Sequence, residues 1–69
     1  MLVEPLYRGH RIQVEARAVD GAWHVEIRVR RVLSEAKPVV LTQRFPLTIQ
    51  DAERRGMLRG KNWVDRHAE

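Results

Sequence analysis

The sequence contains no cysteine, no cluster of histidines and no long hydrophobic run, and each absence removes a class of protein. Without cysteine, no disulfide can stabilise an extracellular domain of this size. His10, His24 and His67 lie in three separate segments without the spacing of metal ligands, so we expect no metal site. No apolar stretch is longer than the three residues of Val39–Leu41, so the sequence predicts no membrane-spanning segment.

The short length of the chain is also informative. A domain of 69 residues buries only about 60% of the surface that its unfolded chain exposes, and small domains usually need an additional source of stability. Since disulfides and metals are not expected, association with another chain is the remaining source. An acidic residue, Glu4, stands where a signal peptide carries basic residues. We therefore expect a single cytoplasmic domain over residues 1–69 that needs no cofactor.

The charge is predominantly positive. The sequence has 13 lysines and arginines against nine acidic residues, and 11 of the 13 bases are arginine. An excess of positive charge favours anionic partners, and a planar guanidinium can bind phosphate or base edges in a bidentate manner. A GC-rich genome, in which arginine codons are common, explains the same bias, so composition alone identifies no partner.

The strongest structural signal is the alternation of apolar and polar residues from Ile12 to Val29, interrupted by Asp-Gly at 20–21. Asp-Gly is a preferred two-residue hairpin turn. A turn of this length pairs residues whose numbers sum to 41, which places Ala18 opposite Trp23 and Ile12 opposite Val29. Apolar residues then meet on one face of the hairpin and polar residues on the other.

A third strand is predicted over Val39–Phe45. If it pairs with the second strand about the middle of the intervening loop, Leu41 lies opposite Val29 and Arg44 lies opposite Glu26. The second of these pairs is favourable because opposite charges meet across the strands.

A helix is predicted to begin at Thr48, whose side chain can cap the first turn. Ala52, Gly56 and Gly60 recur every four residues and therefore share one face of the helix. This spacing favours a helix that continues past Gly60 and uses its small residues to approach the sheet. The alternative is that Gly60 ends the helix and residues 61–64 fold back over the core.

Together these elements predict an α+β domain of β-β-β-α order. A three-stranded antiparallel sheet carries one C-terminal helix on its apolar face. Residues 1–6 are predicted to form an N-terminal arm, because Pro5 disfavours a helix, and residues 65–69 a frayed tail.

One helix covers one side of a sheet, so the other side is expected to meet solvent or a partner. Arginines on such a face can contact phosphates or guanine edges, and an antiparallel ribbon can enter the major groove of a duplex. The residues predicted to form this nucleic-acid surface are Arg8, Arg11, Arg17, Glu26, Arg28, Arg30 and Arg44. Trp23 and Phe45 fall on the core side, so stacking of single-stranded bases is less expected than duplex binding.

The same face also has an ordinary interpretation. In the predicted register Glu15 lies diagonally near Arg28, and Glu26 lies diagonally near Arg17. Diagonal ion pairs of this kind are typical of a solvated sheet surface. Catalysis has little support, because no serine or threonine has a neighbouring histidine and carboxylate that the sequence can place. We therefore expect no enzymatic activity.

Three segments of the chain resemble the anchor segments of AP2/ERF-type DNA-binding domains, namely residues 7–11, 23–28 and 45–53. That family also folds as three strands and a helix, and its exposed sheet face binds the major groove. The resemblance implies DNA contacts at Arg8, Arg11, Glu26 and Arg28. The chain departs from the family pattern in its third strand, which lacks the family's Trp-Leu-Gly, and in the two glycines of its helix.

Nearly the whole chain resembles small stand-alone bacterial proteins of unknown function. The similarity lies in Gly9-x-x-Ile12, in the tryptophan strand, in Phe45 followed by residues 48–56, and in residues 60–65. It implies the β-β-β-α fold and leaves the activity open. The sequence as a whole predicts a non-enzymatic module that binds duplex nucleic acid through its basic sheet face. The alternative is a homodimer or protein-interaction module that uses the open face or an edge strand, favoured by outward-facing valines.

Overall fold

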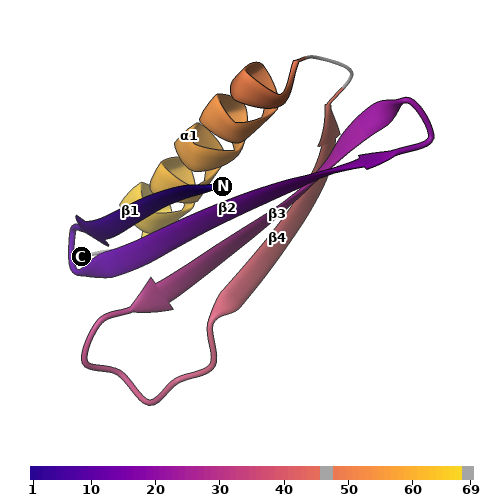
Figure 1. The fold of residues 1–69 in the computed structure, drawn as a ribbon. Helices are drawn as coiled ribbons and strands as arrows, with labels where there is room; N and C mark the ends of the chain where they lie inside the picture. The colour runs from indigo at the N-terminus through magenta and orange to yellow at the C-terminus, as the bar shows by residue number, and fades with distance from the viewer. Residues whose placement is uncertain (46–47, 68–69) are drawn as a thin grey trace.

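A computed structural model describes residues 1–45 and 48–67 and shows an antiparallel sheet with one helix against it (Figure 1). The elements are β1 (Leu2–Tyr7), β2 (His10–Val19), β3 (Ala22–Arg31), β4 (Val39–Phe45) and α1 (Ile49–His67). The strands follow each other in the sheet in chain order, so each connection is a hairpin. The α+β class and the C-terminal helix are confirmed. Pro46 and Leu47, between β4 and the helix, lie outside the described residues.

The sheet has four strands, which corrects the predicted three. The additional strand, β1, is formed by the segment predicted as an N-terminal arm, and Leu2 lies opposite Val14 and Glu4 opposite Ile12. Proline is tolerated on an edge strand because only one side of the strand is paired. Pro5 lies where the register shifts between Glu4 and Tyr7. The prediction that Pro5 disfavours a helix was right, but a proline does not exclude an edge strand.

The hairpin of β2 and β3 has the predicted register, with Ala18 opposite Trp23 and Ile12 opposite Val29. Asp20 and Gly21 have φ values of 49° and 77°. Two successive positive φ angles are typical of the type I′ turn, whose twist matches that of the flanking strands. The turn residues and the apolar alternation therefore specify the same pairing.

The predicted register of β3 and β4 is wrong by two residues. Val29 lies opposite Val39 rather than Leu41, and Glu26 lies opposite Thr42 rather than Arg44. A shift of two keeps every side chain on its predicted face. The long loop between the strands contains no two-residue turn that would fix the register from sequence.

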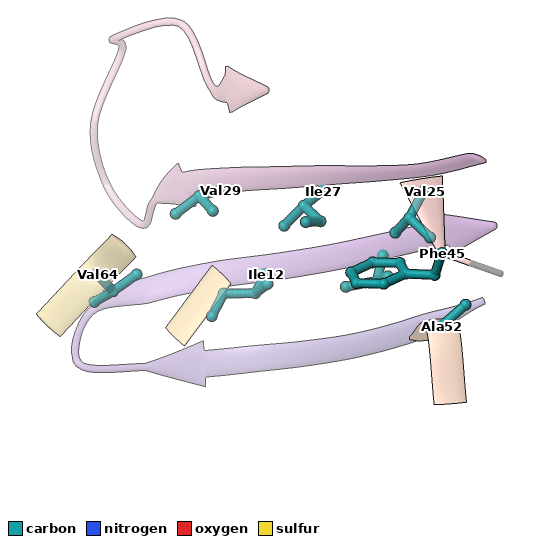
Figure 2. Packing of buried hydrophobic residues seen from close by; sticks show 8 residues of the cluster. Ile12, Val25, Ile27, Val29, Phe45, Ala52 and Val64 are labelled. Carbon is teal, nitrogen blue, oxygen red and sulfur yellow. The ribbon is translucent and has the colours of Figure 1, made fainter. Parts of the chain in front are cut away.

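The core lies between the helix and one face of the sheet (Figure 2). Its buried side chains come from β2, β3, β4 and α1, and they are Ile12, Val14, Val25, Ile27, Val29, Phe45, Ala52 and Val64. Figure 2 shows the aliphatic groups of β2 and β3 side by side, with Phe45, Ala52 and Val64 closing over them. This is the apolar face that the alternation predicts.

The helix continues past Gly60 to His67, as the spacing of the small residues favours. A Cβ atom at Gly56 would lie 2.8 Å from Val14 Cγ1, and one at Gly60 would lie 2.7 Å from Ile12 Cγ2. Both distances are too short for real carbon contacts. The glycines therefore allow the helix backbone to approach β2 and β3 closely.

The two ends of the helix test two further predictions. Thr48 Oγ1 accepts a hydrogen bond of 3.3 Å from the Asp51 amide, which confirms the predicted cap. At the other end the helix includes residues 65–67, which belong to the segment predicted as a frayed tail. Residues 68–69 lie outside the described residues.

Candidate nucleic-acid interface

The helix packs on one face of the sheet, and no helix or strand of the described residues lies over the other (Figure 1). We call this other side the open face. Because side chains alternate along a strand, the neighbours of the buried residues point into it. From β2, β3 and β4 these are Arg11, Gln13, Glu15, Arg17, His24, Glu26, Arg28, Arg30, Val40, Thr42 and Arg44. The open face is therefore mostly polar and carries more arginines than carboxylates.

The structure brings all the predicted nucleic-acid residues together on the open face except Arg8. Arg8 lies in the β1–β2 turn, and its Nη1 donates a hydrogen bond of 2.9 Å to Asp65 Oδ1 at the end of the helix. Tyr7 Oη donates to the same carboxylate at 3.0 Å. These contacts fasten the edge hairpin to the helix, and they engage Arg8 away from the open face.

The contacts of this cluster shift the pKa of Asp65 and of Tyr7. The hydrogen bond from Arg8 lowers the pKa of the Asp65 carboxyl below its usual value. The hydrogen bond to Asp65 raises the pKa of the Tyr7 hydroxyl, because ionised tyrosine can no longer donate it. The cluster is therefore most favourable at pH values between the two titrations.

One end of the open face is strongly basic. Arg11 lies directly opposite Arg30 in the register of β2 and β3. Together with Arg28, Gln13 and Pro38 they line a shallow hollow of about 150 Å³ that has no carboxylate in its lining. Within the part of the chain that the structure describes, neither Arg11 nor Arg30 makes an ion pair. Two opposed arginines thus line this basic hollow, and neither makes an ion pair of its own among the described residues.

The centre of the open face is neutralised. Glu15 lies opposite Glu26, and each pairs with an arginine of its own strand. Arg28 Nε is 2.8 Å from Glu26 Oε1, and Arg17 Nη2 is 3.8 Å from Glu15 Oε1. The predicted diagonal pairs between strands are therefore replaced by pairs along the strands. Glu26 holds the Arg28 side chain against the sheet surface.

A second basic cluster lies at the opposite end, near the β2–β3 turn. His24 lies opposite Arg17 on β2 and opposite Arg44 on β4. Six residues separate His24 from Arg30 along β3, which is about 20 Å for an extended strand. This distance is about the rise of six base pairs along the axis of a duplex.

The described residues show no site for a metal. No group of three or more His, Cys, Asp or Glu side chains comes together within residues 1–45 and 48–67. In the same part of the chain, no helix has the length and apolar character needed to cross a membrane.

Sequence reasoning missed a second hollow, on the helix side of the sheet. A groove of about 490 Å³ runs between α1 and β4. Its apolar lining includes Leu41, Phe45 and Leu58, and its basic lining includes Arg55, Arg59 and Arg66. The spacing of these arginines on one helical face was a signal in the sequence, but only the position of the helix shows what that face lies against.

Comparison with known proteins gives no relative in which these sites could be compared. No protein family, curated protein or solved structure matches the chain. The resemblances to AP2/ERF-type domains and to small bacterial proteins therefore stay predictions, and the functional argument depends on the geometry of this chain.

Proposed function

We propose that this protein is a small non-enzymatic, cytoplasmic module that binds duplex nucleic acid through the open face of its sheet. The observation that carries the proposal is the basic hollow. Arg11 and Arg30 lie opposite each other with no carboxylate beside them. Like charges directly opposite on a sheet destabilise it, and a bound anion removes that cost.

A phosphate group suits this arrangement. A guanidinium can donate two parallel hydrogen bonds to phosphate oxygens, and adjacent arginines can hold one phosphate or two successive ones. Arg28 lines the same hollow, and its Nε donates a hydrogen bond of 2.8 Å to Glu26 Oε1, which leaves its two terminal nitrogens as further donors for a phosphate. The proposed phosphate site therefore consists of Arg11, Arg28 and Arg30.

The second basic cluster extends this site along the strands. Arg17, His24 and Arg44 lie about 20 Å from the basic hollow by strand geometry. A rigid duplex can contact both clusters at once, because its phosphates are spaced along a defined helix. The contacts that we propose for the duplex are therefore distributed over both ends of the open face.

A duplex is favoured over a single strand. Binding of single-stranded bases depends on aromatic platforms. Trp23 and Phe45 lie opposite each other in the register of β3 and β4, on the side that packs against the helix. The open face offers only His24 as an aromatic ring, so backbone contacts by arginine are its main chemistry.

The proposal is tested by measuring duplex affinity as a function of salt, by fluorescence anisotropy of a labelled 12-base-pair DNA and the equivalent RNA. In a plot of the logarithm of the binding constant against the logarithm of the salt concentration, each contacted phosphate makes the slope more negative by about 0.9. Replacing both Arg11 and Arg30 with alanine is expected to weaken binding and to make the slope less negative by about 1.8. The matched control, Arg31→Ala/Arg54→Ala, removes two exposed arginines that lie outside the open face.

Equal loss of affinity in the Arg31/Arg54 control and in the Arg11/Arg30 variant would show only general attraction to a basic protein. Wild-type protein that binds neither duplex at low salt would refute the proposal directly. Circular dichroism of each variant shows whether the sheet remains folded. This control is expected to pass, because Arg11 and Arg30 are both exposed.

A further inference from the structure

The groove between α1 and β4 points to a binding site that is separate from the open face. β4 is the last strand of the sheet and pairs only with β3. Its seven residues, Val39–Phe45, contain no proline and keep a continuous register with β3. The outer edge of β4 therefore offers a row of backbone donors and acceptors that no described strand uses.

The opposite edge of the sheet is protected. β1 contains Pro5, and its register shifts between Glu4 and Tyr7. The helix also contacts β1 more extensively than it contacts β4. Proline, irregular pairing and coverage are the ordinary means by which proteins block strand addition at an edge. None of the three protects β4 within the described residues.

The position of the helix explains why a groove opens beside β4. Gly56 and Gly60 bring the helix backbone down on Val14 and Ile12 of β2 and on residues of β3. The helix therefore lies over the middle of the sheet and leaves the β4 side partly uncovered. Leu58, which lines the groove, is 58% exposed as a result.

The charge of the groove specifies the kind of partner. Arg55, Arg59 and Arg66 line it along the helix, and no carboxylate appears in its lining. Arg59 reaches across to donate a hydrogen bond to Gln43 Oε1 on β4. The groove thus combines a free strand edge, apolar side chains from both walls and a row of guanidinium groups.

We propose that an extended, acidic peptide segment of a protein partner binds in this groove as a fifth strand along β4. Its backbone pairs with the outer edge of β4, as in other cases of strand addition. Its apolar side chains pack against Leu41 and Leu58, and its carboxylates meet Arg55, Arg59 and Arg66. Affinity then comes from main-chain hydrogen bonds, and selection for acidic sequences from the arginines.

Two other occupants fit the groove less well. Single-stranded nucleic acid needs exposed aromatic faces. Phe45 is only 9% exposed. One face of Trp63 is covered by the stacked ring of His67, with the ring centroids 4.1 Å apart. A second copy of this chain, pairing β4 with β4, would bring two basic grooves together. The repulsion between their arginines opposes that dimer.

The test uses two labelled eight-residue peptides with threonine at every second position, together with single-stranded oligothymidylate. The remaining positions, which share one side of a strand, alternate valine with glutamate in one peptide and valine with lysine in the other. Anisotropy is expected to show binding of the glutamate peptide and not of the lysine peptide. The double variant Arg55→Glu/Arg66→Glu is expected to bind the glutamate peptide about tenfold more weakly. A control, Arg31→Glu/Arg54→Glu, changes the net charge equally outside the groove and is expected to retain the affinity.

Amide hydrogen exchange identifies the mode of binding. The glutamate peptide is expected to slow exchange at outward amides of Val39–Phe45 and to leave β1 unchanged. Removal of Arg11 and Arg30 leaves peptide binding intact, so this proposal and duplex binding fail independently. Three results would overturn the peptide proposal. They are equal binding of both peptides, oligothymidylate binding that shifts the NMR resonances of the groove residues, and a dimer whose β4 amides are protected without peptide.

Discussion

The two faces of the sheet are built from the same strands in the same register, yet they differ in how residues pair across the strands. On the covered face the four pairs between Ile12–Ala18 of β2 and Trp23–Val29 of β3 are apolar, as in Val14 with Ile27. On the open face the register opposes Arg11 with Arg30 and Glu15 with Glu26. These four apolar pairs favour stability, whereas the open face carries two pairs of like charge that lower it.

This difference is the basis for placing the proposed duplex site on the open face. A surface shaped only by stability and solubility alternates the signs of its charges across strands. The structure instead pairs Arg28 with Glu26 and Arg17 with Glu15 along each strand, and it leaves Arg11 and Arg30 without a carboxylate. An unfavourable arrangement at an exposed site is explained most simply by a ligand of opposite charge.

The largest effect is expected from the centre of the covered face. Ile27 has no exposed surface and lies beneath both helix glycines. Ile27→Ala leaves a cavity and is expected to lower the free energy of unfolding by about 2–5 kcal/mol. Urea denaturation followed by circular dichroism measures the change. Its neighbour Arg28→Ala, which alters the open face, is expected to stay within about 0.5 kcal/mol.

A somewhat smaller effect is expected where the helix approaches the sheet. Gly60→Val adds methyl groups where a Cβ would already lie 2.7 Å from Ile12 Cγ2. The crowding is expected to cost about 1–3 kcal/mol, despite the better helix propensity of the new residue. Leu58→Ala, on an exposed part of the same helix, is the control. A stabilised Gly60→Val protein would contradict the close packing described for the covered face.

Removal of one arginine from the like-charge pair is expected to raise stability rather than lower it. Arg30→Thr removes one guanidinium opposite Arg11 and introduces a residue that favours strands. It is expected to raise the free energy of unfolding by about 0.2–1 kcal/mol while it weakens duplex binding. A thermal denaturation series at low and high salt measures this gain, which is expected to shrink as salt screens the repulsion. A loss of stability at low salt would mean that the two arginines do not repel.

The two faces also show which features of the structure could be predicted from the sequence. The alternation and the Asp20-Gly21 turn specified the β2–β3 register, and the small residues at 52, 56 and 60 specified the face of the helix. In both cases local chemistry and burial agree. The open face was found for the same reason, since a period of two assigns each residue to one side.

Other features depend on contacts that the sequence does not display. β1 has little apolar alternation, and its position is stabilised by pairing with β2 and by Tyr7 and Arg8, which bind Asp65 far along the chain. Arg8 for this reason lies away from the predicted site. The β3–β4 register depends on a loop without turn signals, and the groove beside β4 depends on where the helix rests.

The smallest expected effect concerns the Asp65 cluster. The hydrogen bond from Arg8 holds the pKa of the Asp65 carboxyl below its ordinary value, so its contribution to stability is present above that ordinary value and lost as pH falls through the lowered one. The hydrogen bond to Asp65 raises the pKa of Tyr7, so its contribution is lost as pH rises through the raised value. Asp65→Asn is expected to lower the melting temperature slightly at neutral pH. The difference from wild type should narrow at both extremes, and a difference independent of pH would contradict the assigned contacts.

The most direct test of the central claim is to map duplex binding on the protein by nuclear magnetic resonance. A titration of labelled protein with the 12-base-pair duplex follows backbone amides and arginine Nε–Hε groups at low salt. The account predicts the largest shifts at Arg11, Arg28 and Arg30, smaller ones at Arg17 and Arg44, and little change along the helix. Shifts confined to the helix side of the sheet, or unchanged spectra at saturating duplex, would contradict it.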